Sequence, residues 1–85
     1  MTPYHRVLWK AIDRILLTDW DPLLLNGIGP SDEYQSYLPS VFKLKIENAT
    51  LDELTDHLVK LEAEVLSRQA NESNCRTVAM KIIRL

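Results

Sequence analysis

Apolar residues recur along this chain at intervals of three and four positions, which is the period of a helix packed on one side. The first run follows Thr2, which can cap a helix, and Pro3, which fits a first helical turn. Its apolar positions are Leu8, Ala11, Ile12, Ile15 and Leu16. The pattern therefore predicts a one-sided helix that starts at Thr2 and ends near Asp19.

A second helix is predicted to begin after Ser31. Its hydroxyl can cap the helix, and Asp32 and Glu33 place negative charge beside the exposed N–H groups of the first turn. The apolar positions that follow are Tyr34, Tyr37, Leu38, Val41, Phe42 and Leu44. Pro39 falls inside this run, where a proline removes one hydrogen bond and clashes with the preceding turn. We therefore expect a kink or a break at Pro39.

Two further helices are predicted in the second half of the chain. Thr50 and Glu53 have the spacing of a capping box, and the helix that they start should run to about Gln69. Its apolar stripe is Leu51, Leu54, Leu58, Leu61 and Val65. Asn71 can cap a last helix, whose apolar face is Cys75, Val78, Ala79 and Ile82. A chain of 85 residues is long enough for one hydrophobic core, so we expect a single domain over residues 1–85. The predicted fold is an all-α bundle of about four helices.

The connection over residues 20–30 contains both glycines of the chain and is rich in turn-forming residues. A helical turn between Asp21 and Asn26 fits its sequence, so we expect a structured loop. Three consecutive leucines in this loop must be buried under the bundle or presented to another molecule. Leu23, Leu24 and Leu25 are therefore a candidate self-interface.

The clearest candidate for a partner-binding site also lies in this part of the chain. Its residues are Trp20, Asp21, Asp32, Glu33, Tyr34 and Tyr37. In one interpretation they are structural: the indole covers the core, the acidic residues serve helix starts and the tyrosines pack. In the other they form an acidic, aromatic patch for a basic protein partner. The sequence leaves both interpretations open.

The same residues carry a resemblance to a family of small, uncharacterised bacterial helical proteins. The shared signature is Trp20-Asp21-Pro22, followed by Pro30-Ser31-Asp32-Glu33-Tyr34, and the resemblance covers roughly residues 15–66. It implies an all-α fold and implies no activity.

Composition and charge argue against two classes of protein, membrane proteins and nucleic-acid binders. The longest apolar runs are three residues, against the roughly 20 that cross a bilayer, and no signal-peptide pattern opens the chain, so we expect a cytoplasmic protein without membrane binding. A net charge of −2 is unlike the basic footprint of a nucleic-acid binder.

Residues 32–64 carry 3 positive and 8 negative charges, and residues 65–85 carry 4 positive and 1 negative. We expect the basic last helix to complement the acidic middle within the fold.

No residue pattern predicts catalysis, a cofactor or a metal site. His5, His57 and Cys75 invite a Cys–His hypothesis, but His57 borders the leucine stripe and Cys75 occupies an apolar helical position. Metal-binding loops and helices with the usual ligand spacing are absent from the sequence. The leading hypothesis is a non-enzymatic module that binds another protein, such as an inhibitor or immunity-type protein. The alternative is a homo-oligomeric structural or regulatory subunit, so both a monomer and a homodimer remain open.

Overall fold

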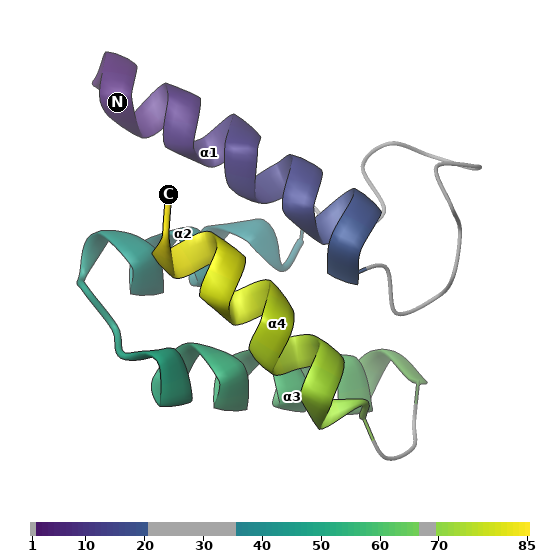
Figure 1. Cartoon of the computed structure of the whole chain (residues 1–85). Coiled ribbons are helices and arrows are strands. Elements are labelled where there is room, and N and C mark those ends of the chain that lie inside the picture. Colours follow the sequence, from purple (N-terminus) through teal and green to yellow (C-terminus); the bar gives the residue numbers. More distant parts are fainter. Residues whose placement is uncertain (1, 21–35, 67–69) are drawn as a thin grey trace.

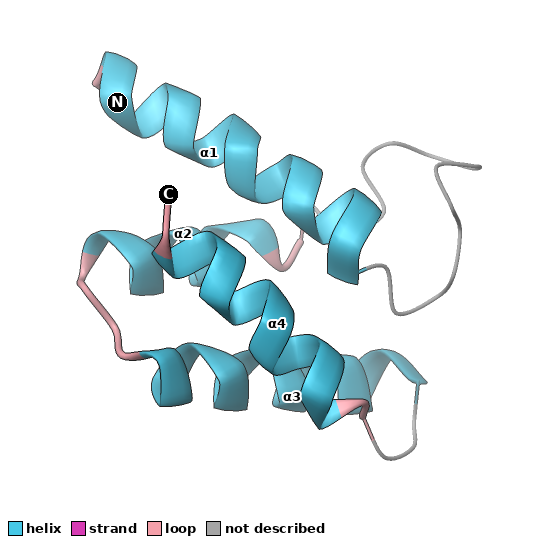
Figure 2. Ribbon diagram, viewed as in Figure 1, coloured by secondary structure: helices cyan, strands magenta, loops and turns pink. Residues whose placement is uncertain are grey.

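A computed structural model describes residues 2–20, 36–66 and 70–85, with the side chains of residues 65 and 66 left out. These residues form α1 (Pro3–Ile15), the π-helical turn η1 (Leu16–Trp20), α2 (Leu38–Ile46), α3 (Leu51–Leu66) and α4 (Glu72–Ile83). Within them there is no strand (Figure 2). The predicted all-α class is confirmed.

The helices form a small bundle in which α1 and α3 lie on opposite sides (Figure 1). Helix α4 crosses between them, and α1 and α3 each pack against both α2 and α4. None of the helices in the described part of the chain has the length and apolar character needed to span a membrane.

Local capping chemistry sets three of the helix starts. The Thr2 hydroxyl accepts the His5 N–H at 3.1 Å, and the Asn71 side chain accepts the Asn74 N–H at 3.1 Å. At the start of α3, Glu53 N–H donates to the Thr50 hydroxyl at 3.2 Å. Thr50 N–H donates to the Glu53 carboxylate at 3.0 Å, which completes the capping box. The three caps predicted for these helices are confirmed.

Helix α2 is shorter than the predicted second helix. Residues 36 and 37 form a turn and α2 begins at Leu38, so Pro39 lies in the first turn, where proline is tolerated. Helix α2 thus begins just before Pro39, where a kink or break was expected, and the predicted start at Ser31 lies outside the described residues. Helix α2 ends at Ile46, and Asn48, which follows it, has a positive φ of 59° that accompanies hydrogen bonds from Asn48 N–H to Lys45 O and from Ala49 N–H to Leu44 O.

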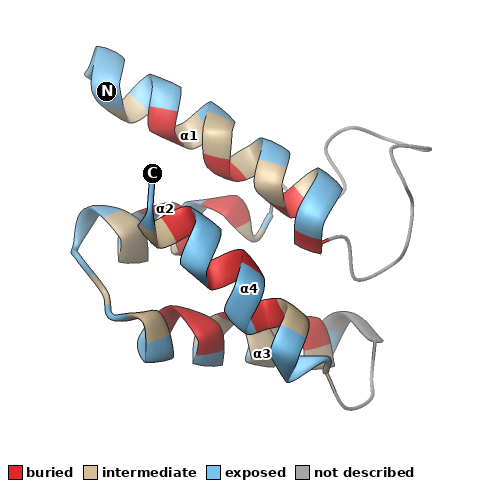
Figure 3. Cartoon of the chain, viewed as in Figure 1, coloured by how far each residue is buried: buried red, intermediate tan, exposed pale blue. Residues whose placement is uncertain are grey.

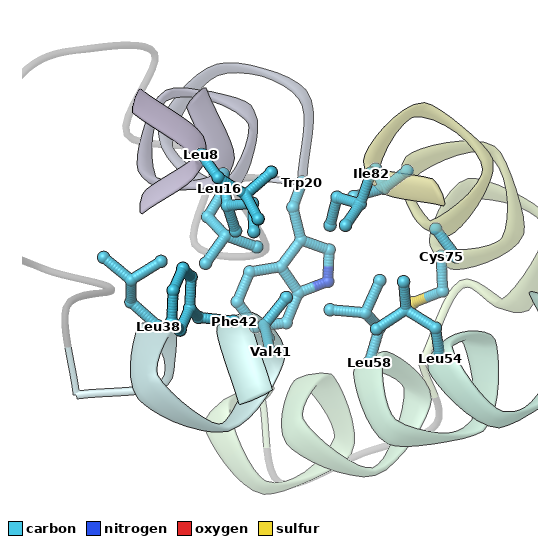
Figure 4. Packing of buried hydrophobic residues seen from close by; sticks show 13 residues of the cluster. Leu8, Leu16, Trp20, Leu38, Val41, Phe42, Leu54, Leu58, Cys75 and Ile82 are labelled. Carbon is cyan, nitrogen blue, oxygen red and sulfur yellow. The ribbon is translucent and has the colours of Figure 1, made fainter. Parts of the chain in front are cut away.

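The core collects buried side chains from every helix (Figures 3 and 4). Its members are Leu8, Ile12, Leu16, Trp20, Leu38, Val41, Phe42, Leu54, Leu58, Cys75, Val78, Ala79 and Ile82. The wider turns of η1 rotate less per residue than α-helical turns, which carries Trp20 back toward the side of α1 that holds Leu16. The indole then projects into the centre of the bundle.

Candidate functional site

The structure places two of the six candidate partner-binding residues, Trp20 and Tyr37. Trp20 is only 2% exposed, and the half-buried Tyr37 meets its ring edge-on at 6.0 Å between centroids. A partner could reach the Trp20 ring only by opening the core, so the structural interpretation holds for this residue, and we remove it from the candidate surface. The other four candidates, Asp21, Asp32, Glu33 and Tyr34, lie outside the described residues, as do Leu23, Leu24 and Leu25.

The basic residues of α4 pair with acidic residues elsewhere in the fold. Arg76 contacts Asp52 on α3 at 3.0 Å, and Lys81 contacts Asp19 of η1 at 3.4 Å. Both pairs are substantially exposed to solvent, so each contributes little to stability. The Arg76 pair agrees with the prediction that α4 complements the acidic middle of the chain, whereas Lys81 pairs with Asp19, which lies outside that segment.

A hydrogen-bonded pair, Ser40 on α2 and His57 on α3, has the residue types of a catalytic dyad. The Ser40 hydroxyl lies 2.8 Å from His57 Nε2 and 2.9 Å from the Tyr37 carbonyl oxygen. A carbonyl only accepts, so the single hydroxyl proton is donated to Tyr37, and His57 must donate its Nε2 proton to Ser40. This polarity is the reverse of what an activated serine needs. The pair therefore serves as a link between α2 and α3.

Beside this link lies a pocket of about 300 Å³ lined by Leu44, Glu53, Asp56, His57 and Lys60. Desolvation lowers the pKa of His57, and the nearby charge of Lys60 lowers it further. Hydrogen bonds from the Thr50 backbone and hydroxyl lower the pKa of Glu53, so its carboxylate is ionised at neutral pH. Because His57 is neutral, the charged groups of the pocket are the carboxylates of Glu53 and Asp56 and the ammonium of Lys60. The pocket therefore carries a net negative charge, and Leu44 is its apolar lining residue.

A buried carboxylate and thiol connect α3 to α4. Glu62 is 3% exposed and accepts the Asn71 N–H at 2.5 Å and the Cys75 thiol at 3.7 Å. Burial and the charge of Glu62 raise the pKa of Cys75 to about 11, although a hydrogen bond with the Trp20 side chain opposes the shift. The thiol is therefore protonated and buried at neutral pH. The sequence interpretation placed Glu62 outside the apolar stripe, but it follows Leu54 and Leu58 at four-residue intervals and belongs to the inward face.

The outward side of α1 combines cations with apolar side chains and is hereafter the outer face of α1. It consists of Tyr4, Arg6, Val7, Lys10 and Arg14, all of them exposed. Tyr4 is 60% exposed and Val7 is 68% exposed, the two largest values among the large apolar side chains that the structure describes. No carboxylate in the described part of the chain lies within ion-pair distance of the three cations.

The opposite side of α1 holds this face in place. The rings of His5 and Trp9 meet Phe42 of α2 with centroids 5.7 and 5.1 Å apart. The outer face is therefore presented on an anchored helix. Sequence reasoning missed it, although a signal was present: Val7 is apolar, it lies one turn from Tyr4 and one turn from Lys10, and it is not among the apolar positions predicted for this helix.

Within the described residues no group of three or more His, Cys, Asp and Glu side chains is arranged to hold a metal ion. In the part of the chain that the structure describes, the outer face of α1 and the pocket between α2 and α3 are candidate binding surfaces. Comparison of the chain with protein-family models, with curated proteins and with solved structures finds no match.

Proposed function

We propose that this protein is a non-enzymatic protein-interaction module that binds through the outer face of α1. The observation that carries the proposal is the exposure of Tyr4 and Val7 among three cations without an ion-pair partner in the described part of the chain. Aromatic and aliphatic side chains next to arginines are the residues that anchor protein contacts.

The charge of this face indicates an acidic partner. Arg6, Lys10 and Arg14 follow one another at four-residue intervals and so form a single stripe along α1. Such a stripe attracts a negatively charged protein surface and speeds its association. The earlier hypothesis of an acidic patch for a basic partner rests on residues outside the described ones and stays a prediction, as does the comparison with immunity-type inhibitors.

The non-enzymatic part of the proposal is supported by the two candidate nucleophiles. In this arrangement Ser40 donates its proton to the Tyr37 carbonyl oxygen instead of to His57. Cys75 is fully buried, and its pKa of about 11 keeps it a thiol at neutral pH. Neither side chain is in the state that nucleophilic catalysis requires.

Affinity capture with matched variants tests the proposal. The wild-type protein and a Tyr4→Ser, Val7→Ser variant serve as baits, with Met80→Ser as the control because Met80 is an exposed apolar residue on α4. Each captured protein is then purified, and its direct binding to each bait is measured by calorimetry at low and high salt. We expect a partner whose affinity falls at least about tenfold with the α1 variant, is unchanged with the control, and weakens with salt.

Equal binding to the wild-type protein and the α1 variant, by every protein captured, would contradict a role for the outer face of α1. Circular dichroism of the three baits must show equal helix content, since Tyr4 and Val7 are largely exposed and their truncation should not unfold the chain.

A further inference from the structure

We propose that the surface bound by the outer face of α1 is the α2–α3 pocket of a second copy of this chain, so that copies associate head to tail. The inference rests on the proposed function, because it names the occupant of the same face. Three observations carry it: opposite charge on the two surfaces, an apolar residue in each, and their positions on different sides of the bundle.

The charges of the two surfaces are complementary. The outer face of α1 carries three cations, whereas the pocket and the next turn of α3 carry Glu53, Asp56 and Glu64, with Lys60 as the one cation among them. Within the described residues, no cation lies within ion-pair distance of Asp56 or Glu64. Asp56 and Glu64 on one surface, and the three cations on the other, thus form no ion pair within the described part of the molecule, and the two surfaces carry net charges of opposite sign.

The apolar parts of the two surfaces also correspond. Val7 lies one turn from Tyr4 and one turn from Lys10, so it is surrounded by the other members of the outer face. Leu44 is half-buried and contributes to the pocket together with charged side chains. In the proposed contact, Val7 covers the exposed part of Leu44, which otherwise packs against the core, and the cations of α1 approach the acidic residues beside the pocket. An exposed apolar side chain and a pre-existing pocket elsewhere on the same molecule are the ingredients of a head-to-tail contact.

The arrangement of the helices decides the symmetry of the contact. Helices α1 and α3 lie on opposite sides of the bundle, with exposed residues along the outward edge of each (Figures 1 and 3). One copy can therefore use both surfaces at the same time, each with a different neighbour. Such a contact is heterologous, so it extends into a chain of copies or closes into a ring, unlike a two-fold dimer.

Two variants that each lack one surface test this symmetry. Val7→Ser, Lys10→Ser removes the apolar and cationic centre of the outer face of α1, and Asp56→Lys, Glu64→Lys reverses the charge beside the pocket. Sedimentation equilibrium at protein concentrations up to about 1 mM detects even weak association. We expect the wild-type mass to rise above the 9.8 kDa of the chain as concentration increases. Each variant alone should remain a monomer, and their equimolar mixture should form a dimer and stop.

A third variant should associate more tightly than the wild type. Lys60 is the cation of the pocket, so Lys60→Gln should tighten the association of the otherwise wild-type chain by several-fold. Raising the ionic strength to about 1 M, which shortens the screening length to about 3 Å, should weaken the association of the wild type and of this variant.

The inference is overturned if the wild type stays at the monomer mass throughout, or if the two variants fail to combine. It is also overturned if either variant still associates with itself, because a two-fold interface or another surface would then be responsible. The proposed function is judged separately by the capture experiment. A monomeric protein whose outer face still binds another protein would leave that function standing and remove only the second copy as its partner.

Discussion

At the residue scale, Trp20 joins the N-terminal helix to the rest of the core. Its ring lies among side chains of α1, α2, α3 and α4 (Figure 4), and its side chain also hydrogen bonds with Cys75. Trp20 continues the four-residue spacing of Leu8, Ile12 and Leu16, so it lies on the inward side of α1 and η1.

Trp20→Ala should therefore lower the free energy of unfolding by about 3–5 kcal/mol, the usual cost of truncating a large buried aromatic side chain. Urea unfolding followed by circular dichroism measures the change. Tyr4→Ala is the matched control, because Tyr4 is 60% exposed and its truncation should cost no more than about 0.5 kcal/mol. Similar losses in the two variants would contradict the central position of Trp20.

Cys75 should be unreactive in the folded protein and reactive when the chain unfolds. Its thiol is fully buried and its pKa is about 11, so little thiolate is present at pH 8 and reagents cannot reach it. Labelling with a chromogenic disulfide reagent at pH 8, with and without denaturant, measures the difference. Rapid labelling of the native protein would show that the thiol is accessible.

The Cys75 thiol makes the free energy of unfolding depend on pH in the alkaline range. The pKa is raised from 9.0 to about 11 by folding, so the folded state holds the proton more tightly than the unfolded state does. Stability from this group is present below pH 9 and is lost as the pH rises through 11. Cys75→Ala should show a flatter decline over this window in thermal unfolding, whereas an identical slope would exclude the thiol as its cause.

At the element scale, the capping box is the signal that fixes the start of α3. Thr50→Ala should cost about 1 kcal/mol, because the Glu53 N–H loses its hydroxyl acceptor at the first turn. Urea unfolding measures this loss, and Thr77→Ala is the control. The Thr77 hydroxyl is exposed and bonds only back to Ser73 O within α4. An equal effect of both substitutions would mean that the cap contributes nothing of its own.

The Ser40–His57 bond between α2 and α3 makes a different prediction, at acidic pH. The pKa of His57 is lowered by desolvation, so the unfolded chain binds a proton at this residue more tightly than the folded one. Stability from neutral His57 is therefore present above pH 6.5 and is lost as the pH falls through the lowered pKa. His57→Gln should lose less stability than the wild type between pH 7 and pH 5 in urea unfolding. A loss as large as that of the wild type would contradict the assignment.

At the scale of the whole molecule, the sequence predicts what is local and misses what depends on packing. The caps at Thr2, Thr50 and Asn71 depend on side chains three positions from the groups that they bond, so spacing alone reveals them. The burial of Glu62 depends on α4, whose Asn71 N–H and Cys75 thiol satisfy the carboxylate. Hydropathy assigns a glutamate to the surface, and only the four-residue register from Leu58 indicates otherwise.

The candidate binding site was also missed by sequence reasoning, because its exposure depends on how the helices pack. The sequence interpretation favoured residues 20–37 because aromatic and acidic residues are concentrated there, and Trp20 then proved to be part of the core. The outer face of α1 was hidden because its cations fell where a solvated helix side is expected. Exposure of Tyr4 and Val7 becomes visible only when α1 is placed against α2 and α4, with His5 and Trp9 turned inward.

The central claim is that the outer face of α1 is a protein-binding surface and that a second copy supplies its complement. Dilution of the isotope-labelled wild-type protein from millimolar to micromolar concentration, followed by amide chemical shifts, tests it most directly. The account predicts concentration-dependent shifts at two separate places, around Val7 and Lys10 on α1 and around Asp56 and Lys60 on α3, with smaller changes at Met80 on α4. Spectra that do not change with concentration, or changes that spare either surface, would contradict it.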